Sequence, residues 1–280
     1  MRCDLHTHTV HSDGSYSVKR LVSEAKELDL IIALTDHNTV SGLREFLAEA
    51  EAQGVTAIGG TELSTVWEGR EFHLLGLFID PEHFDRLESL FLHYHQLKEQ
   101  SNIDLVEKLN KMGYKIDFAE IKRKNINGRV NRAHIADELI KCGYVSSSSE
   151  AFANLLEENC GIYIPPERLP LTDAVRLLRE MRALPILAHP LKEIGIEKLE
   201  EMLPKLISCG LVGIETMHSS YSEEQIALSK ALAEKYNLLE SGGSDFHGNI
   251  KHGVALGVGK GNLNIPVEIY EALLKRKSEI

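Results

Sequence analysis

The chain begins with the stretch MRCDLHTHTVHSDGSYS, residues 1–17, in which a short apolar run leads into His6 and His8. Side chains two residues apart in an extended strand point to the same face. His6 and His8 can therefore offer two imidazoles to one metal ion from the end of one strand. Asp13 follows in a Ser-Asp-Gly turn, which can fold its carboxylate back to the same place. A single His-x-His pair also fits two surface histidines, so its meaning depends on how the later strands end.

Two further predicted strands end in side chains of the same kind. Continuous apolar runs at 30–34 and 55–58 have the pattern of strands buried on both faces, and they are followed by His37 and Glu62. Segments with helical spacing separate the three strands, which predicts parallel strands joined by crossover helices. Ligands of such folds collect beyond the carboxyl ends of the strands. Metal-binding residue types at three strand ends therefore predict a shared site.

Candidate ligands continue through the rest of the chain. His73 begins an apolar segment and, taken alone, fits a core histidine, but the company of the other candidates favours a metal ligand. The later strand ends add three more candidates: His189, Asp245 and His247. One ion takes four to six ligands, some of them water, so this set of nine fits two or three ions with bridging carboxylates. Mixed nitrogen and oxygen ligation without cysteine favours Mn²⁺, with Fe²⁺ or Zn²⁺ as alternatives.

The composition limits the partners of the chain. Its 280 residues have ordinary hydrophobic and charged shares and a formal net charge of −11. Such a chain lacks the basic face that binding of duplex DNA requires, although bound cations can still attract a small anionic substrate. The four cysteines are scattered, which suits a reducing cytosol, and there is no signal-peptide pattern and no apolar run near the ~20 residues of a membrane span. We therefore expect a cytoplasmic protein that binds neither duplex DNA nor a membrane.

The alternation of strands and helices is interrupted once. Residues 101–170 contain short helical segments without a strong strand pattern, and the alternation then resumes up to a last strand predicted at 254–258. We therefore expect an α/β barrel in two halves, residues 1–100 and 171–280, with a small helical insertion or cap at 101–170 between them.

One stretch of the predicted insertion has a pattern suited to anions. If Asn131 caps a helix, Arg132 and His134 lie in its first turn, where the helix N-terminus favours negative charge. Arginine also binds phosphate through two parallel hydrogen bonds. A solvent-exposed helix start explains the same residues, and only a position over a metal site would favour phosphate binding.

A cluster of several cations has a defined chemistry. It lowers the pKa of a bound water from about 15.7 toward ~7 and so supplies hydroxide at neutral pH. It also binds phosphoryl oxygens and neutralises charge while the bond to the leaving oxygen breaks. The residues alone thus predict a multinuclear metal hydrolase on an α/β barrel, with a phosphate ester as the favoured substrate.

The order of these motifs resembles the PHP (polymerase and histidinol phosphatase) superfamily. The matching stretches span most of the chain: His6-Thr7-His8-Thr9, Ser12-Asp13-Gly14, Thr35-Asp36-His37-Asn38-Thr39, Gly60-Thr61-Glu62, His189-Pro190 and Ser244-Asp245-Phe246-His247. The resemblance implies a distorted, seven-stranded, TIM-like (β/α) barrel with a trinuclear site. It implies three ligand sets: His6, His8, Glu62 and Asp245 for one ion, Glu62, His73 and His189 for a second, and Asp13, His37 and His247 for a third.

Within that superfamily, the insertion and the Arg132-Ala133-His134 run resemble the 3',5'-nucleotide bisphosphate phosphatases. This branch implies hydrolysis of the 3'-phosphate of a 3',5'-bisphosphorylated nucleoside by metal-bound hydroxide, which leaves the nucleoside 5'-monophosphate. Some relatives trim short RNA from its 5' end. Members of the branch carry Arg-Pro-His where this chain has Ala133. The candidate substrate contacts are then Arg132, His134 and His218, the last of which lies near Glu215 at another strand end.

Three other functions remain compatible with the sequence. A phosphatase for a small metabolite such as histidinol phosphate would use the same ligands. An amidohydrolase also begins with His-x-His on a barrel, but it usually relies on a strand-end lysine, and we find none in the sequence pattern. An inactive, metal-stabilised module, like the polymerase-associated domains of this fold, often lacks part of the ligand set, whereas the full set is present here.

Overall fold

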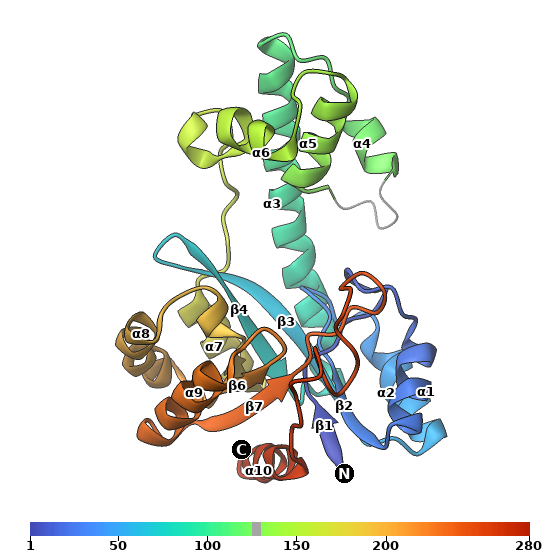
Figure 1. The fold of residues 1–280 in the computed structure, drawn as a ribbon, viewed down its shortest axis with the longest axis vertical. Helices are drawn as coiled ribbons and strands as arrows, with labels where there is room; N and C mark the ends of the chain where they lie inside the picture. Colours follow the sequence, from blue (N-terminus) through green and yellow to red (C-terminus); the bar gives the residue numbers. More distant parts are fainter. Residues whose placement is uncertain (125–129) are drawn as a thin grey trace. The chain divides into compact units, whose positions relative to one another are not determined.

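The computed structural model describes residues 1–124 and 130–280, so residues 125–129 of the predicted insertion lie outside the described residues. The chain divides into two compact units, which we name the barrel unit and the helical unit: Met1–Ser89 together with Leu169–Ile280, and Leu90–Arg168. Helix α3 (Phe84–Lys111) contains the first boundary between them (Figure 1). The barrel unit mixes strands and helices, whereas the described part of the helical unit contains helices.

The barrel unit is organised around one sheet in which chain neighbours are also sheet neighbours. Seven strands form it in the described residues: β1 (Arg2–Asp4), β2 (Leu30–Leu34), β3 (Ala57–Trp67), β4 (Arg70–Leu77), β5 (Leu184–Leu187), β6 (Gly213–His218) and β7 (Leu239–Gly243). The sheet closes where the chain beyond β1 meets the end of β7. Leu5 N donates to Gly242 O (3.1 Å), and His8 N donates to Phe246 O (2.8 Å). The predicted seven-stranded, distorted α/β barrel is confirmed.

Strand β4 gives the barrel its distortion. It runs antiparallel to β3 and β5, while the other neighbouring strands are parallel. Trp67 pairs with Arg70, which leaves Glu68 and Gly69 as a two-residue turn. Both turn residues have positive φ angles, 49° and 78°, which is the requirement of the type I' turn that joins adjacent antiparallel strands. The hairpin therefore replaces a crossover helix at this point.

Four helices connect parallel strands of the barrel unit: α1 (Val18–Glu27), α2 (Leu43–Gln53), α8 (Ile196–Cys209) and α9 (Glu223–Lys235). Helix α7 (Leu171–Glu180) leads into β5, and α10 (Val267–Ser278) follows the last strand. Ser17 caps α1, because its hydroxyl accepts a hydrogen bond from Arg20 N (3.3 Å). The buried residues of α1 recur at helical spacing: Val18, Leu21, Val22 and Ala25. Burial of that stripe, rather than propensity alone, keeps the helix on the sheet.

The strand predicted at 254–258 is wrong. In this stretch Ala255 and Gly259 exchange backbone hydrogen bonds of 2.8 and 2.9 Å, which closes a tight turn. Gly257 and Gly259 have φ angles of 73° and 58°, which lie outside the strand region. The apolar residues that suggested a strand instead belong to a loop.

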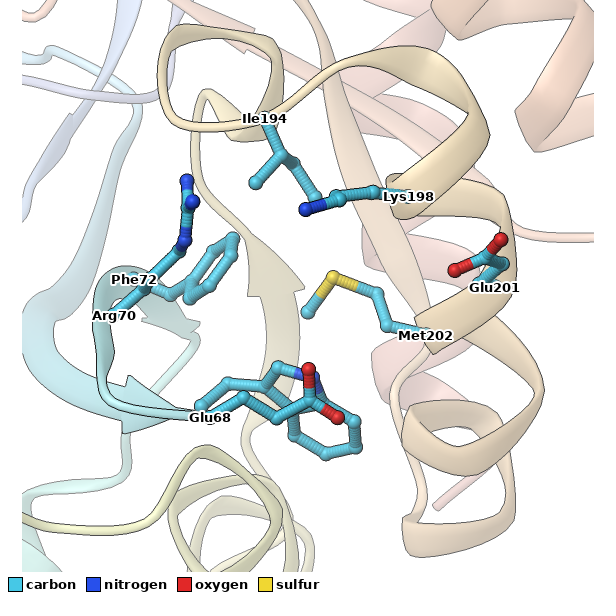
Figure 2. A pocket seen from close by; sticks show the side chains of 8 residues that line it. Glu68, Arg70, Phe72, Ile194, Lys198, Glu201 and Met202 are labelled. Carbon is cyan, nitrogen blue, oxygen red and sulfur yellow. The ribbon is translucent and has the colours of Figure 1, made fainter.

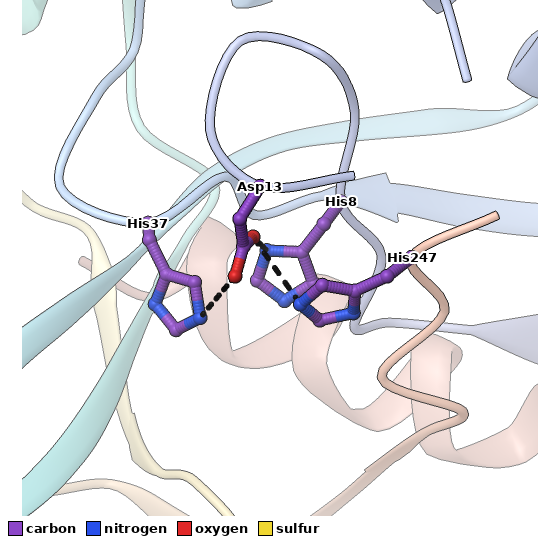
Figure 3. A group of neighbouring side chains, drawn as sticks. All are labelled: His8, Asp13, His37 and His247. Carbon is purple, nitrogen blue, oxygen red and sulfur yellow. Dashed lines mark ion pairs between the residues drawn. The ribbon is translucent and has the colours of Figure 1, made fainter. Parts of the chain in front are cut away.

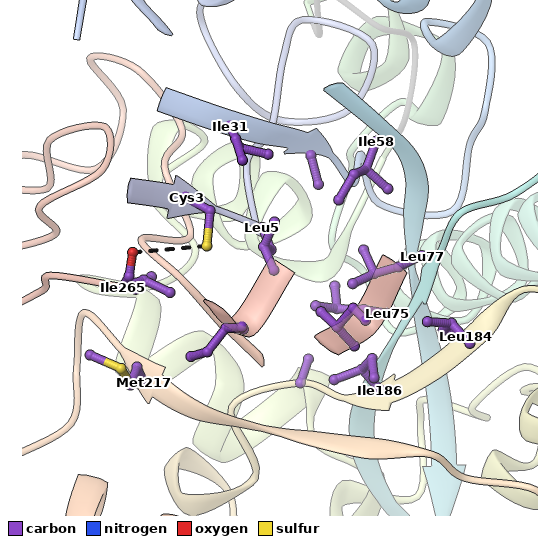
Figure 4. Close-up of a cluster of buried hydrophobic side chains, with 14 of the residues drawn as sticks. Cys3, Leu5, Ile31, Ile58, Leu75, Leu77, Leu184, Ile186, Met217 and Ile265 are labelled. Atoms are coloured by element: carbon purple, nitrogen blue, oxygen red, sulfur yellow. Dashed lines mark hydrogen bonds between the residues drawn. The ribbon is translucent and has the colours of Figure 1, made fainter. Parts of the chain in front are cut away.

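A buried apolar cluster holds the strands together (Figure 4). Strands β1 to β6 contribute Cys3, Ile31, Ala33, Ile58, Leu75, Leu77, Leu184, Ile186 and Met217. Helix α10 adds Ile269 and Leu273, so the end of the chain is packed into the same core. Side chains of this size contribute about 1.5–3 kcal/mol each when they are fully buried. A core of this kind fixes the strands, and with them the loops that follow.

The helical unit has its own apolar core. Besides most of α3 it contains α4 (Phe118–Lys124), α5 (Arg132–Lys141) and α6 (Ser148–Ala151). The core residues come from these helices and their connections: Leu105, Val106, Leu109, Ile121, Ile135, Leu139, Leu155 and Tyr163. Asn131 caps α5, as predicted, because its side chain accepts a hydrogen bond from His134 N (3.1 Å). Among the described residues, no helix combines the length and the apolar character that crossing a membrane would require.

Candidate metal centre

All nine candidate ligands lie in the barrel unit and form one connected cluster. They come from β3, β4 and the segments after β1, β2, β5 and β7: Glu62, His73, His6, His8, Asp13, His37, His189, Asp245 and His247. Each of them has a nitrogen or oxygen within 3.3 Å of a nitrogen or oxygen of another member. Closure of the barrel brings these segments together, because the chains beyond β1 and β7 pair directly.

Glu62 is the centre of the cluster. Its Oε2 atom lies 2.9 to 3.2 Å from one ring nitrogen of each of three histidines: His6, His8 and His37. Its Oε1 atom lies 2.8 and 3.0 Å from ring nitrogens of two more: His73 and His189. The carboxylate is fully buried. Because imidazoles lie beside each of its two oxygens, Glu62 could act as a ligand of more than one cation.

Two aspartates complete the cluster, one of them buried and one exposed. Asp245 Oδ1 lies 3.3 Å from His8 Nε2 and 3.5 Å from His247 Nδ1. Asp13 Oδ1 lies 3.2 Å from His247 Nε2, and Asp13 Oδ2 lies 3.9 Å from His37 Nε2 (Figure 3). The side chain of Asp13 is 56% exposed, whereas that of Asp245 is buried. Asp13 therefore marks the open side of the cluster.

Two of the candidate ligands have strained backbones. His189 and Asp245 have φ angles of 30° and 57°, in the left-handed region that non-glycine residues seldom adopt. Such a conformation costs roughly 1–3 kcal/mol and persists only where the surroundings hold it. Here His189 N donates to Glu215 Oε2 (2.7 Å), and Asp245 N donates to His6 O (2.9 Å). Strain at two neighbouring positions of one cluster is typical of a functional site.

Several buried ring nitrogens of the cluster have no hydrogen-bond partner. Within the described residues they are both nitrogens of His8 and the Nδ1 atoms of His37, His73 and His189. A buried nitrogen left in this state costs about 1–3 kcal/mol. The nearest nitrogens of His8, His37 and His73 lie 2.8 to 3.2 Å from Glu62, close but not aligned for a hydrogen bond. Lone pairs that converge in this way fit the ligands of divalent metal ions.

The donor atoms fall into three groups, each of which could hold one ion. Within each group the donor atoms lie within 4.8 Å of one another: His6, His8, Glu62 and Asp245; His37, Glu62 and His73; His8, Asp13, His37 and His247. The first group has the same members as one set that the resemblance implies. The second contains His37 in place of His189, and the third gains His8. The groups in the structure and the sets implied by the resemblance therefore differ only in His8, His37 and His189, each of which lies close to more than one group.

Charge and burial act in opposite directions in this cluster. Burial by itself raises the pKa of Glu62, but the interactions with the imidazoles of His37, His6 and His73 hold it well below its usual value. Burial lowers the pKa of His6, but Glu62 and Glu215 raise it well above its usual value. Burial dominates at His37 and lowers its pKa to about 3. The cluster is thus a set of carboxylates and imidazoles that stabilise one another's charges when no metal is bound.

Removal of metal should make the stability of the protein pH-dependent. Burial lowers the pKa of His8 and His73, but the close carboxylates of Asp245 and Glu62 raise the pKa of His8 to about 9 and that of Glu62 raises the pKa of His73 to about 10, above the ordinary value of 6.5. A raised pKa stabilises the folded state fully below pH 6.5, and this contribution is lost as the pH rises toward 9. We expect the Tm of chelator-treated protein to fall between about pH 6.5 and 9.5. The Tm of Mn²⁺-treated protein should not fall, since deprotonated imidazoles bind metal better.

Thermal melts at three pH values across this range, with EDTA or with Mn²⁺, measure the difference. The gap between the two Tm values should widen as the pH rises. A Tm that rises with pH in EDTA would contradict the expectation, because it would mean that the imidazoles are stabilising when neutral.

Glu215 orients two of the candidate ligands. Its Oε1 atom lies 3.0 Å from His6 Nδ1, and its Oε2 atom accepts a hydrogen bond from His189 N (2.7 Å). A hydrogen bond from Nδ1 to a carboxylate fixes the tautomer of an imidazole, so His6 Nε2 is left to face Glu62. Glu215, which the sequence placed beside His218 at a strand end, thus contacts two candidate ligands.

Replacement of Glu215 by glutamine should weaken metal binding by about 10- to 100-fold, the range seen when a group that orients a ligand is changed. The amide oxygen of glutamine can still accept a hydrogen bond from His189 N or from His6 Nδ1, but not from both through two oxygens, and it carries no negative charge. Titration of the apoprotein with Mn²⁺ measures the effect. Unchanged metal affinity would show that Glu215 has only a structural role.

Two other buried carboxylates fix the loops that carry ligands. Asp4 accepts hydrogen bonds from Ser244 N (2.8 Å), Ser244 Oγ (2.5 Å) and Gly257 N (2.8 Å), next to Asp245. Sequence analysis missed Asp4, although a carboxylate inside a short buried strand immediately before His6 was a usable signal. Because β1 is so short, that carboxylate reaches the loop after β7 rather than solvent.

The Asp36 carboxylate fixes the loop that follows β1 and carries His8 and Asp13. It accepts hydrogen bonds from Thr9 N (2.8 Å), Thr9 Oγ1 (2.6 Å) and Ser12 Oγ (2.5 Å). These contacts hold the turn between His8 and Asp13. The third sequence-predicted substrate contact, His218, lies in the same unit, where its Nε2 atom is 3.3 Å from Asp245 Oδ2.

The other two predicted substrate contacts lie in the helical unit. Arg132 Nη1 donates to Leu156 O (2.8 Å), and its guanidinium lies 4.4 Å from the centre of the Tyr163 ring. His134 Nδ1 accepts a hydrogen bond from Asn131 N (3.2 Å), which completes the cap of α5. Their described contacts thus stay within the helical unit.

A separate pocket lies on the other side of the β3–β4 hairpin (Figure 2). Residues of the hairpin, of α8 and of the segment just before α8 line it: Trp67, Glu68, Arg70, Phe72, Ile194, Lys198, Glu201 and Met202. Successive strand residues alternate in direction, so Phe72 faces this pocket while His73 faces Glu62. The only tryptophan of the chain is therefore not part of the metal cluster.

An α/β barrel that gathers imidazoles and carboxylates around buried, unpartnered ring nitrogens defines the class of metal-dependent hydrolases. The chain belongs to the PHP domain family, whose model matches residues 4–164. The match includes the four segments that carry the first six candidate ligands, and most of the helical unit.

Curated relatives cover nearly the whole chain. A 5'-3' exoribonuclease of Haemophilus influenzae is 30% identical over 87% of this chain and 89% of its own length. A phosphoribosyl 1,2-cyclic phosphate 1,2-diphosphodiesterase of Eggerthella lenta is 31% identical over 88% of this chain and 94% of its own length. A 3',5'-nucleoside bisphosphate phosphatase of Chromobacterium violaceum is 27% identical over 87% of this chain and 86% of its own length.

A solved structure extends the likeness to the fold. It was assigned as a metal-dependent phosphoesterase of Bifidobacterium adolescentis, and it matches 98% of this chain and 96% of its own with a TM-score of 0.76 at 27% identity. The chain is thus a metal-dependent phosphoesterase, a hydrolase that acts on phosphate esters. None of the three curated relatives is named an amidohydrolase, but a second solved structure, named an amidohydrolase of Chromobacterium violaceum, matches 99% of this chain and 97% of its own with a TM-score of 0.77 at 25% identity.

Proposed function

We propose that the protein hydrolyses the 3'-phosphate of 3',5'-bisphosphorylated nucleosides and releases nucleoside 5'-monophosphate and phosphate. The observation that carries this proposal is the chemistry shared by the named relatives. A nucleoside bisphosphate, an RNA chain and a phosphoribosyl cyclic phosphate all contain a ribose with phosphate esters on more than one oxygen. A small acidic protein suits such free or single-stranded substrates better than duplex DNA. Four free thiols favour a cytoplasmic location.

We further propose three divalent ions, with Mn²⁺ favoured over Fe²⁺ and Zn²⁺ because the donors are imidazoles and carboxylates. The three donor groups around Glu62 would hold them. When bound, such ions supply positive charge for phosphoryl oxygens and acidify water. Glu62 and Asp245 keep the imidazoles oriented, and the buried surroundings of both carboxylates limit competition from solvent.

Arg132 and His134 are proposed as contacts of the phosphate that remains on the product. The arginine would have to use donors beyond the one that it gives to Leu156 O. Replacement of Arg132 by alanine should then reduce kcat/KM for a nucleoside bisphosphate far more than for a generic aryl phosphate. Equal losses on both substrates would limit Arg132 to its packing role within the helical unit.

The substrate is tested by phosphate release from adenosine 3',5'-bisphosphate, from 5'-AMP, from 3'-AMP and from histidinol phosphate, each with Mn²⁺ present. We expect kcat/KM to be at least about 100-fold higher for the bisphosphate, which corresponds to roughly 3 kcal/mol from the second phosphate. Chromatography should identify 5'-AMP as the product. Equal rates on the monophosphates would remove the claim, and a preference for histidinol phosphate would replace it.

A second candidate, 5'-3' hydrolysis of short RNA, is favoured by the exoribonuclease relative. A 5'-phosphorylated oligoribonucleotide of three to five residues distinguishes it. Stepwise release of nucleoside 5'-monophosphates at a kcat/KM above that for the bisphosphate would make RNA the preferred substrate.

A further inference from the structure

We infer that Lys192 and Lys251 form a phosphate-binding pair in the barrel unit, which binds the phosphoryl group that the enzyme hydrolyses. The inference deepens the phosphoesterase site and rests on the proposed hydrolysis of a phosphate ester there. Neither lysine belongs to the motifs of the sequence, and both are identified only by their position beside Asp245.

Asp245 divides the site into two sides. Its Oδ1 atom faces the imidazoles of the cluster, with His8 Nε2 at 3.3 Å. Its Oδ2 atom faces the two lysines, with Lys251 Nζ at 2.5 Å and Lys192 Nζ at 3.9 Å. The same carboxylate thus lies between the groups that would hold metal and two positive charges of the protein.

The backbone at Lys192 is anchored next to His189, and the side chains of both lysines reach solvent. Lys192 ends the short helix η4 (Pro190–Lys192), which directly follows His189, and Leu191 N donates to Tyr221 Oη (2.9 Å). Lys251 follows His247 in the loop beyond β7. The two lysine side chains are 36% and 38% exposed, whereas that of Asp245 is buried. The ammonium groups therefore lie at the accessible edge of a buried cluster.

A phosphate ester brings about two negative charges to a site that already contains buried carboxylates. Glu62, Glu215 and Asp245 would repel it unless positive charge lies on the approach. Asp245 would be neutralised by a divalent ion held in its donor group. The ammonium groups of Lys251 and Lys192 are then free to donate to a phosphoryl oxygen, as lysine commonly does with phosphate. Each lysine would thus lie beside Asp245 when no metal is bound and would donate to a phosphoryl oxygen when metal and substrate are bound.

The test compares phosphate binding with metal binding in the full-length protein. The variants are Lys192→Gln, Lys251→Gln and the double variant, with Lys260→Gln as the matched control, because Lys260 is an exposed lysine of the same C-terminal loop region. Calorimetric titration of the Mn²⁺-loaded proteins with inorganic phosphate gives the Kd, and elemental analysis after dialysis gives the metal content. Lys251→Arg keeps the charge and serves as the conservative variant.

We expect each glutamine variant to raise the Kd for phosphate by roughly tenfold, the size of one charge-assisted hydrogen bond, and the double variant by roughly 100-fold. Metal content should be unchanged, and Lys251→Gln should bind Mn²⁺ at least as tightly as the native protein, because no ammonium competes for Asp245. Lys251→Arg should retain most of the phosphate affinity. In the glutamine variants, the KM for the phosphate ester should rise by a larger factor than kcat falls.

Two results would overturn the inference. In one, the double variant retains its metal and binds phosphate as tightly as Lys260→Gln does. In the other, metal and phosphate affinity fall together, which would mean that the lysines only support Asp245. The proposed substrate is tested separately, since native protein that binds phosphate through both lysines but ignores nucleoside bisphosphates would disprove the substrate and keep the lysine pair.

Discussion

Replacement of Glu62 by glutamine should abolish stable metal binding and reduce phosphoesterase activity by about a thousandfold. The carboxylate lies 2.8 to 3.2 Å from ring nitrogens of five histidines and is fully buried. Removing one partner of a buried, charged network costs about 3–5 kcal/mol, and each 1.36 kcal/mol corresponds to a factor of ten in rate. Elemental analysis after dialysis, together with phosphate release from adenosine 3',5'-bisphosphate or an aryl phosphate, measures both effects.

The matched control is Glu71→Gln. Glu71 lies on β4, and its carboxylate is 3.3 Å from His73 Nε2, but its side chain is 51% exposed. An exposed ion pair contributes at most about 1 kcal/mol, so the control should keep its metal and lose less than about fivefold in activity. Glu62→Gln protein that is folded, holds its full complement of metal and remains active would disprove the central role of this carboxylate.

Replacement of Gly243 by alanine should destabilise the protein by about 3 kcal/mol or more and displace a candidate ligand at the same time. A Cβ atom built at Gly243 would lie 2.2 Å from His6 Cβ and 2.7 Å from His6 N. The clash involves backbone atoms, which cannot move without opening the junction between β1 and β7. Chemical denaturation gives the free energy of unfolding, and Mn²⁺ titration shows whether His6 still binds.

Gly59→Ala is the control for this substitution. Gly59 also lies in a strand, β3, but a Cβ atom there would be 3.6 Å from its nearest neighbour, an ordinary contact. We expect its free energy of unfolding to change by less than about 1 kcal/mol. If Gly243→Ala were no more destabilising than Gly59→Ala, the close approach of the two strands would not hold in solution.

Much of the candidate site could be predicted from the sequence, because its signals are local. His-x-His at a strand end, a Ser-Asp-Gly turn and polar side chains after apolar runs are all visible within a few residues. Repetition of this pattern at several strand ends predicted that the side chains would meet, since parallel strands place their carboxyl ends at one edge. The capping of α5 by Asn131 was likewise predictable from neighbouring residues.

Other features depend on pairs of residues far apart in the chain. Glu215 reaches His6 across 209 positions and Asp4 reaches Ser244 across 240, and no local pattern links such partners. The strand predicted at 254–258 failed for a related reason. Its apolar residues fit a strand, but Gly257 and Gly259 adopt positive φ angles in a loop that Asp4 holds through Gly257 N.

The sequence by itself determined which residue types occur at the strand ends and therefore the kind of chemistry that the barrel can perform. The tertiary structure alone decided that Glu62 lies at the centre, that Glu215 orients His6, and that Lys192 and Lys251 face Asp245. The physical reason is closure of the sheet. Residue type is a property of single positions, whereas the distance between two side chains depends on how β1 and β7 pair, which no single segment of the chain specifies.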